Sequence, residues 1–214
     1  MTISAKAERT EAVSELKRSL ILAAARRVFE SEGLDRASIR AIAREAGYTA
    51  GAIYFYFPSK EAIYGAILQE LIGRLVESVE RAVVDAKKPE QRFQLATLAF
   101  FDFFAEDPRD LDFGFYLFGG GMRPHGISRE ADAALNESLL RSLAPVSEAA
   151  RQCGFDADEA RACAASAFAH AVGLLLLKHT RRIRIFALEP RVLMEMYAQS
   201  VAIQFEGRCK TMAV

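Results

Sequence analysis

The chain has 214 residues, of which 51% are hydrophobic, so it is long and apolar enough for one large or two modest domains with buried cores. Lys and Arg match Asp and Glu at 28 each, and this zero net charge argues against a protein that coats nucleic acid non-specifically. Residues 1–60 nevertheless hold ten basic and seven acidic side chains, which places a modest attraction for phosphate at the N-terminal end.

The cysteine content argues against a disulfide scaffold. Cys153, Cys163 and Cys209 are few and far apart in the sequence, and no Cys-x-x-Cys pair suggests a zinc site. Residues 1–17 lack the apolar block of a signal peptide, and the most apolar run, residues 162–177, is too short to span a membrane. We therefore expect a cytoplasmic protein without metal, cofactor or membrane partner, in which residues 162–177 form a buried helix.

The N-terminal region begins with charged and small residues. Residues 1–14 show no apolar period, so we expect a flexible arm there. A helix is predicted over residues 16–31, where Ile21, Ala25 and Val28 lie on one apolar side. Gly33 is expected to end this helix.

Two short helices joined by a tight turn are predicted for residues 38–57. In the first helix, apolar residues at i, i+3, i+4 and i+7 form one face, and Arg40 and Arg44 share the opposite face. Gly47 can adopt the left-handed conformation that ends a helix, so residues 47–49 form the turn. The second helix runs from about residue 50 to residue 57, and the arrangement is typical of a unit that enters a DNA groove.

The second helix presents a small, uncharged and aromatic surface. With Ile53 and Phe57 turned inward, a rotation of about 100° per residue turns Gly51 and Phe55 outward. Such a face suits apolar contact with thymine methyl groups, because glycine lets the backbone approach the bases. An aromatic stripe at helical spacing more often belongs to a core. Here the inward positions are already filled, which favours a surface that reads DNA.

The order of four sequence segments points to a known family. AAARRVFESEG, SIRAIAREAG, GAIYFYF and SKE follow one another, and over roughly residues 16–70 the chain resembles the DNA-binding domain of the TetR family of bacterial transcriptional regulators. Ala37 and Tyr48 depart from the commonest pattern, which has a hydroxyl residue and a valine at these positions. The departures concern one helix cap and the packing of the turn.

Residue chemistry and this resemblance together indicate two sets of DNA contacts in a helix-turn-helix domain of residues 15–60. Contacts to the DNA backbone are expected from hydroxyl and cationic side chains. These residues are Ser38, Arg40, Thr49, Tyr54, Tyr56 and Lys60. Contacts to bases are expected from Gly51, Ala52 and Phe55 on the outward side of the second helix. The resemblance adds Ala50 to this set, although the helical rotation turns Ala50 inward near Ile53.

A long linking helix is predicted over residues 61–88. Its wide apolar stripe, which includes Ile67, Leu71 and Val79, indicates packing on two bodies. Pro89 stops it. A rigid helix shared by the DNA-reading domain and the rest of the chain would transmit a structural shift from one to the other. This coupling is a hypothesis.

Residues 89–214 are expected to form a helical ligand-binding and dimerisation domain, which makes the whole fold all-α. Helices are predicted at about residues 90–105, 108–118, 128–153, 158–182 and 189–207. Aromatic residues crowd the first two of these helices and either fill a core or line an apolar cavity. The resemblance implies a small effector in this domain. The candidate ligand residues are Phe100, Phe104, Tyr116, Arg123, His125 and His170.

The last two long helices are the expected dimer interface. Small residues recur every three or four positions from Ala162 to Gly173 and would allow close packing of helices. The partner face on the last helix would consist of Leu193, Met196, Tyr197, Val201 and Phe205. The resemblance implies the same mode of assembly, in which two helices of each chain form a four-helix interface.

No catalytic constellation is visible, because the chain lacks a Gly-x-Ser-x-Gly elbow, a pair of histidines at i and i+4, and a glycine-rich loop after a strand. We interpret the chain as a homodimeric transcriptional repressor that binds a palindromic operator in double-stranded DNA and is released by an apolar or aromatic effector. The alternative is a helical sensor or carrier of an apolar ligand without specific DNA binding. A non-specific architectural role is disfavoured by the weak net charge.

Overall fold

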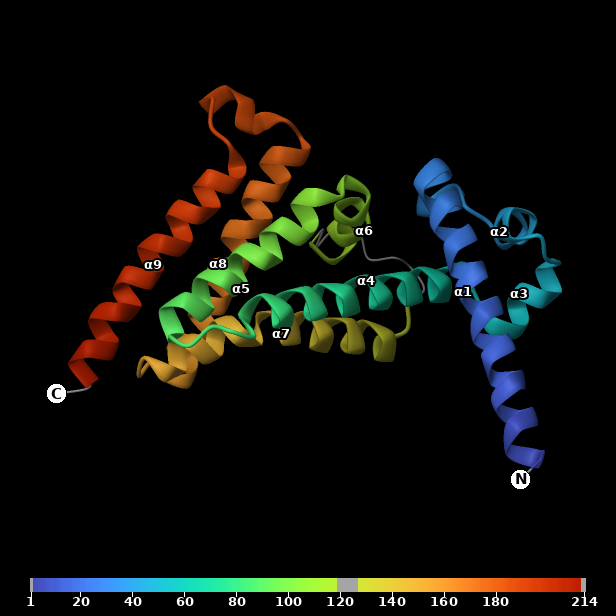
Figure 1. Ribbon diagram of the computed structural model, residues 1–214. Helices are drawn as coiled ribbons and strands as arrows, with labels where there is room; N and C mark the ends of the chain where they lie inside the picture. Colours follow the sequence, from blue (N-terminus) through green and yellow to red (C-terminus); the bar gives the residue numbers. More distant parts are fainter. Residues whose placement is uncertain (1, 119–126, 213–214) are drawn as a thin grey trace. The chain divides into compact units, whose positions relative to one another are not determined.

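The computed structural model describes residues 2–118 and 127–212, and these residues form helices and connecting loops without a strand. The all-α fold class expected from the sequence is therefore confirmed. The helices, shown in Figure 1, are α1 (Thr2–Arg36), α2 (Ile39–Ala46), α3 (Ala50–Tyr56), α4 (Lys60–Val83), α5 (Pro89–Glu106), α6 (Pro108–Phe118), α7 (Arg129–Gln152), α8 (Ala157–His179), the short 3₁₀ helix η1 (Arg182–Phe186) and α9 (Pro190–Met212).

The chain divides into two compact units. Among the described residues, the first unit contains residues 2–70 and 127–133, and the second contains residues 71–118 and 134–212. The boundary falls inside α4, between Glu70 and Leu71, so this helix contributes residues to both units.

The first unit is built on α1, which is longer than the sequence pattern suggested. It runs from Thr2 to Arg36, with a break at Gly33, where φ is 75°. The arm expected at residues 1–14 is thus helical from residue 2 onward. No glycine or proline precedes Gly33, and the segment is rich in alanine, glutamate, lysine and arginine, which all favour a helix. Residues 7–13 of this helix are exposed, as the lack of an apolar period implies, and that lack did not prevent the helix from forming.

The core of the first unit joins one apolar face from each of its helices. The fully buried side chains include Ile21 of α1, Ile42 of α2, Ile53 of α3 and Ile63 of α4. Burial of each such side chain contributes roughly 1.5–3 kcal/mol to folding. This common core fixes the orientation of α2 and α3 on α1.

The second unit is a helical domain with an aromatic core. In Figure 1, α8 and α9 form an antiparallel pair joined by η1, and α5 packs against both helices. Phe93 and Phe101 of α5 and Phe205 of α9 are buried between them. Arg74 of α4 binds both carboxylate oxygens of Asp110 at 2.9 and 3.1 Å. Because Asp110 is buried, this pair supplies the charge partner that its carboxylate needs.

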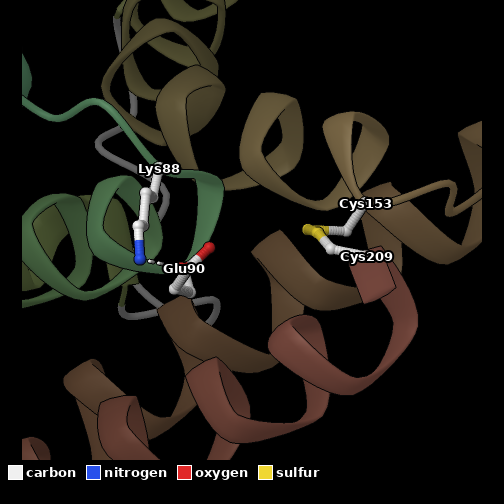
Figure 2. The surroundings of a disulfide bond; sticks show 4 residues. All are labelled: Lys88, Glu90, Cys153 and Cys209. Atoms are coloured by element: carbon white, nitrogen blue, oxygen red, sulfur yellow. Dashed lines mark ion pairs between the residues drawn. A yellow bond between two sulfur atoms is a disulfide. The ribbon is translucent and has the colours of Figure 1, made fainter. Parts of the chain in front are cut away.

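A disulfide bond corrects our expectation about the cysteines. Cys153, which follows α7, is bonded to Cys209 in α9, and Figure 2 shows the bond between the two chain segments. The two residues are 56 positions apart in sequence, yet their Cα atoms are 4.6 Å apart because the α8–α9 hairpin returns the chain to its starting point. Cys163 is a free thiol whose pKa is raised by burial. The bond also removes the support that cysteine content gave to a reducing location.

Helix α8 corrects a second expectation. It is 23 residues long, and among the described helices it is the one that is long and apolar enough to cross a membrane by length and composition. Only 33% of its most apolar window is buried within the chain, whereas the sequence pattern suggested a buried helix. Core helices of soluble proteins pass the same test of length and composition. Much of the apolar surface of α8 is therefore exposed in the described chain.

Candidate nucleic-acid interface

The turn between α2 and α3 has the geometry that its glycine predicts. The hydroxyl of Ser38 accepts a hydrogen bond from the Ala41 amide at 3.2 Å and caps the start of α2. At the other end, Gly47 has φ 72° and ψ 27°, and the Tyr48 amide donates to the Ala43 carbonyl at 2.8 Å. This backward hydrogen bond ends α2 in the left-handed conformation that favours glycine.

Helix α3 is short but fixed at both ends. The Thr49 hydroxyl accepts from the Ala52 amide at 3.2 Å, and the Phe57 amide donates to the Ile53 carbonyl at 2.9 Å. Ile53 is fully buried and Phe57 is 5% exposed, so the two residues expected to face inward do so. These contacts orient α3 without using its outward side.

The outward side of α3 is uncovered in the described part of the chain. Phe55 is 82% exposed and Tyr54 is 56% exposed, and Gly51 is also exposed. Ala50, Ala52 and Tyr56 are half-buried. The rings of Phe55 and Tyr56 meet edge to face with centroids 5.1 Å apart. An aromatic ring left in water at the centre of a rigid helix face is available to a partner.

Hydroxyl and guanidinium groups border this surface on α2 and the turn. The Ser38 and Thr49 hydroxyls serve as acceptors for helix amides, and each still carries its own O–H for donation to a phosphate oxygen. Arg40 lies exposed on α2, as the helical pattern indicated. These groups can hydrogen bond to a DNA backbone without rearranging the turn.

Lys60 has a different environment from the one expected of a phosphate ligand. Its Nζ donates to the carbonyl oxygens of Leu34, Asp35 and Ala37 at 2.7, 2.9 and 3.0 Å. An ammonium group has three donors, and all three are used at the end of α1. Sequence patterns could not reveal this, because the contacts join residues 23 to 26 positions apart.

A hollow beside α3 brings in residues that sequence reasoning left out. It has a volume of about 260 Å³ and is lined by Lys17, Ile21, Tyr48, Ala52, Phe55 and Tyr56. Lys17 precedes Ile21 by one helical turn, which is the spacing that puts two side chains on one face of α1. The spacing was visible in the sequence, but the packing of this face beside α3 was not.

The proposed ligand residues of the second unit lie in a filled core. Phe100 is 2% exposed and Phe104 is fully buried, with ring centroids 5.5 Å apart. A Cβ atom built on Gly114 would lie 2.8 Å from the Phe104 ring, so the packing there is tight. The side chain of Tyr116 and all of Arg123 and His125 lie outside the described residues.

His170 is the exception in this group, because it has unsatisfied hydrogen-bonding capacity. Its ring stacks on Tyr197 with centroids 4.2 Å apart, and burial lowers its pKa despite a hydrogen bond with the Leu193 backbone. The Nε2 atom is buried without a hydrogen-bond partner.

A hollow of about 380 Å³ in the second unit contains none of the predicted ligand residues. It is lined by Phe101, Asp102, Ala105, Glu106, Lys178, Glu189, Pro190 and Arg191.

The described residues offer no group of three His, Cys, Asp or Glu side chains that could hold a metal ion. What the first unit does present is a border of hydroxyl groups around an exposed aromatic centre.

The sequence that forms this surface is similar to a known family of proteins. Residues 21–67 match the sequence model of the bacterial regulatory proteins of the tetR family. The HTH-type transcriptional activator FasR of Mycolicibacterium smegmatis is 36% identical over 91 residues, which is 42% of each chain. The HTH-type transcriptional repressor BepR of Brucella suis is 34% identical over 106 residues, 47% of this chain and 49% of that protein. The chain thus spans about half the length of these curated relatives.

The fold extends the similarity over most of the chain. The transcriptional regulator FadR of Bacillus subtilis, solved in complex with stearoyl-CoA, superposes with a TM-score of 0.63 and 20% identity. The superposition covers 87% of this chain and 96% of the FadR chain. At this level of identity the similarity establishes the helical architecture, including the second unit that the sequence match does not reach.

Proposed function

Through its N-terminal unit the chain belongs to the tetR family of bacterial regulatory proteins, and we propose that it is a homodimeric transcriptional repressor of the bacterial cytoplasm. It binds a palindromic operator with α3 of each subunit in successive major grooves. Proteins of this class regulate transcription and are not enzymes. The curated relatives include both an activator and a repressor, and repression is the sign of regulation that we propose.

The observation that carries the proposal is the exposure of Phe55 at the centre of a rigidly oriented α3. An 82% exposed phenylalanine is unfavourable in water unless a partner covers it, and thymine methyl groups offer apolar contact in the major groove. The base-facing residues are Ala50, Gly51, Ala52 and Phe55. The residues that contact the DNA backbone are Ser38, Arg40, Thr49, Tyr54 and Tyr56.

The exposed apolar side of the α8–α9 hairpin supports the homodimer. On α8 the exposed residues include Ala165, Ala169 and Gly173, whose small size allows close helix packing. On α9 the exposed apolar residues are Val192, Met196 and Ile203, at 48%, 63% and 59%. A second copy of the same face would cover both helices and form a four-helix interface.

The face of α9 differs in detail from the one expected from the sequence. Phe205 is buried against Phe93 and Phe155, and Tyr197 is stacked on His170, so neither is free for a partner chain. Met196 and the half-buried Leu193 and Val201 remain candidates for the interface, and Val192 and Ile203 add exposed apolar area.

An apolar small molecule is the proposed effector. FadR was solved with stearoyl-CoA, which supports a ligand with an apolar chain for a domain of this architecture. The candidate contacts remain Phe100, Phe104, Tyr116, Arg123, His125 and His170. Because Phe100 and Phe104 are fully packed, an effector bound there would separate them. The unpaired Nε2 of His170 would supply a polar contact.

Selection of bound duplexes from a random library, followed by fluorescence anisotropy, tests the proposal. We expect a palindromic consensus bound by two chains per duplex. Phe55→Ala should change the sequence preference, whereas Tyr54→Phe should weaken all bound duplexes about equally. Leu140→Ala is the matched control, since Leu140 is 69% exposed in the second unit. If no duplex is enriched, the chain is instead a helical sensor or carrier of an apolar ligand.

A further inference from the structure

Lys60 closes the C-terminal end of α1. The carbonyl groups of Leu34 and Asp35 lie in the last turn of α1, after the break at Gly33, and that of Ala37 follows the helix. Carbonyl groups at a helix end lack intrahelical partners and carry partial negative charge. The Lys60 ammonium satisfies these three oxygens at 2.7–3.0 Å. A charge-assisted contact of this kind is lost if the side chain turns toward another anion.

The side chain of Lys17, unlike that of Lys60, is not held by other groups of the described chain. Its side chain is exposed on α1, and no ion pair holds it within the described part of the chain. It lines the hollow of about 260 Å³ together with Tyr48, Phe55 and Tyr56. An unpaired cation thus lies on the same surface as the exposed aromatic residue of α3.

The lining of the hollow matches the two parts of a DNA backbone. The rings of Tyr48 and Tyr56 offer apolar surface to a deoxyribose, and the Lys17 ammonium offers a charge to the adjoining phosphate. Arg18, the next cation on α1, is differently engaged, since it lies over the Phe57 ring at 5.2 Å and within 4.0 Å of Glu70.

We infer that Lys17, and not Lys60, is the lysine that contacts a DNA phosphate beside α3, and that Lys60 is a positioning residue that holds the end of α1 against the start of α4. This inference rests on the proposed DNA-binding function. The ligand is the sugar-phosphate backbone of the operator flank, and the contact is made once by each subunit.

The salt dependence of operator affinity separates the two lysines. Loss of one phosphate contact reduces the slope of log K against log salt by about 0.9, so Lys17→Gln should reduce it by about two for a dimer. Between 50 and 200 mM salt the loss of affinity should accordingly shrink about tenfold relative to the unchanged protein. Lys17→Arg should retain the original slope, because arginine also pairs with phosphate.

Lys60→Gln should show the reverse pattern, with an unchanged slope and a lower melting temperature by circular dichroism. Lys87→Gln is the control for charge loss alone, because Lys87 is exposed in the second unit. It should leave both measurements unchanged. Since Lys17 is exposed, its glutamine variant should melt at the original temperature.

An unchanged slope for Lys17→Gln overturns the inference, as does a slope reduced to the same extent by Lys60→Gln. If Lys60→Gln fails to fold, the Lys17 variants still decide the assignment of the phosphate contact. Failure of the unchanged protein to bind any selected duplex would instead overturn the proposed function itself, so the two failures are distinguishable.

Discussion

Helices α3 and α5 both carry several aromatic residues at helical spacing, yet the structure uses them in opposite ways. On α3, Phe55 is 82% exposed, whereas Phe104 on α5 is fully buried. The difference comes from the neighbours. One side of α3 is filled by Ile53 and Phe57 and the other has no covering element among the described residues, while α5 is packed by α6, α8 and α9.

This contrast shows that residue type alone does not separate a binding surface from a core. A phenylalanine on α5 contributes its apolar area to the stability of the second unit. Phe55 on α3 is 82% exposed and contributes little to that stability, and under the proposed function its ring contacts DNA. Stability and DNA affinity should therefore respond to different substitutions.

The largest expected effect is on the buried side of the comparison. Phe104→Ala should lower the free energy of unfolding by about 3–5 kcal/mol, because it leaves a cavity in a tightly packed aromatic core. Phe55→Ala should change it by less than about 0.5 kcal/mol. Urea unfolding followed by circular dichroism measures both values. A comparable loss for the two variants would mean that α3 is covered in solution.

The disulfide bond of the second unit should give the next largest effect. Closing a loop that spans 56 positions stabilises the fold by about 4 kcal/mol in the chain-entropy model. Reduction by dithiothreitol, or Cys153→Ala with Cys209→Ala, should lower the melting temperature of the second unit. The variant Cys163→Ala is the control, since Cys163 is free, and it should respond to reductant as the unchanged protein does.

A smaller effect is expected at the cap of α3. Thr49→Ala removes the acceptor for the Ala52 amide and should destabilise the first unit by about 1 kcal/mol. Ser19→Ala is a matched control, because the Ser19 hydroxyl donates a hydrogen bond to the Leu16 carbonyl within α1 and caps no helix end. Equal melting temperatures for the two variants would show that the Thr49 hydroxyl does not hold α3.

The smallest effect concerns pH. Burial lowers the pKa of His170 in the folded protein, so the unfolded chain binds its proton first as pH falls. The second unit should therefore lose stability as pH falls below about 6.5, the ordinary histidine value. His170→Gln should flatten this dependence in urea unfolding between about pH 5 and pH 7.5. An identical slope in the variant would assign the dependence to other groups.

Local signals predicted the parts of the fold that depend on neighbouring residues. Gly47 marked the end of α2, and the spacing of Ile53 and Phe57 oriented α3, because helix caps and periodicity act over a few positions. The contacts of the Lys60 side chain were not predictable, since they are made with three carbonyl groups at and just beyond the end of α1.

Three further features of the structure were not predicted from the sequence. The pairing of Cys153 with Cys209 required knowledge that the α8–α9 hairpin folds back on itself. The helical N-terminus was missed because an exposed helix of charged residues has no apolar period to detect. The hollow beside α3 is formed by residues from α1, the turn and α3 together, and no single segment shows it.

The covalent tie between Cys153 and Cys209 also limits how two copies can associate. The segment between these residues includes all of α8 and η1 and most of α9, so this hairpin is anchored at both ends to its own subunit. Exchange of α9 between two chains, the domain swap open to an untethered terminal helix, would require breaking the bond. In the proposed homodimer, α9 of the oxidised chain therefore stays with its own subunit, and mixing two tagged populations should yield hybrids without reduction of the bond.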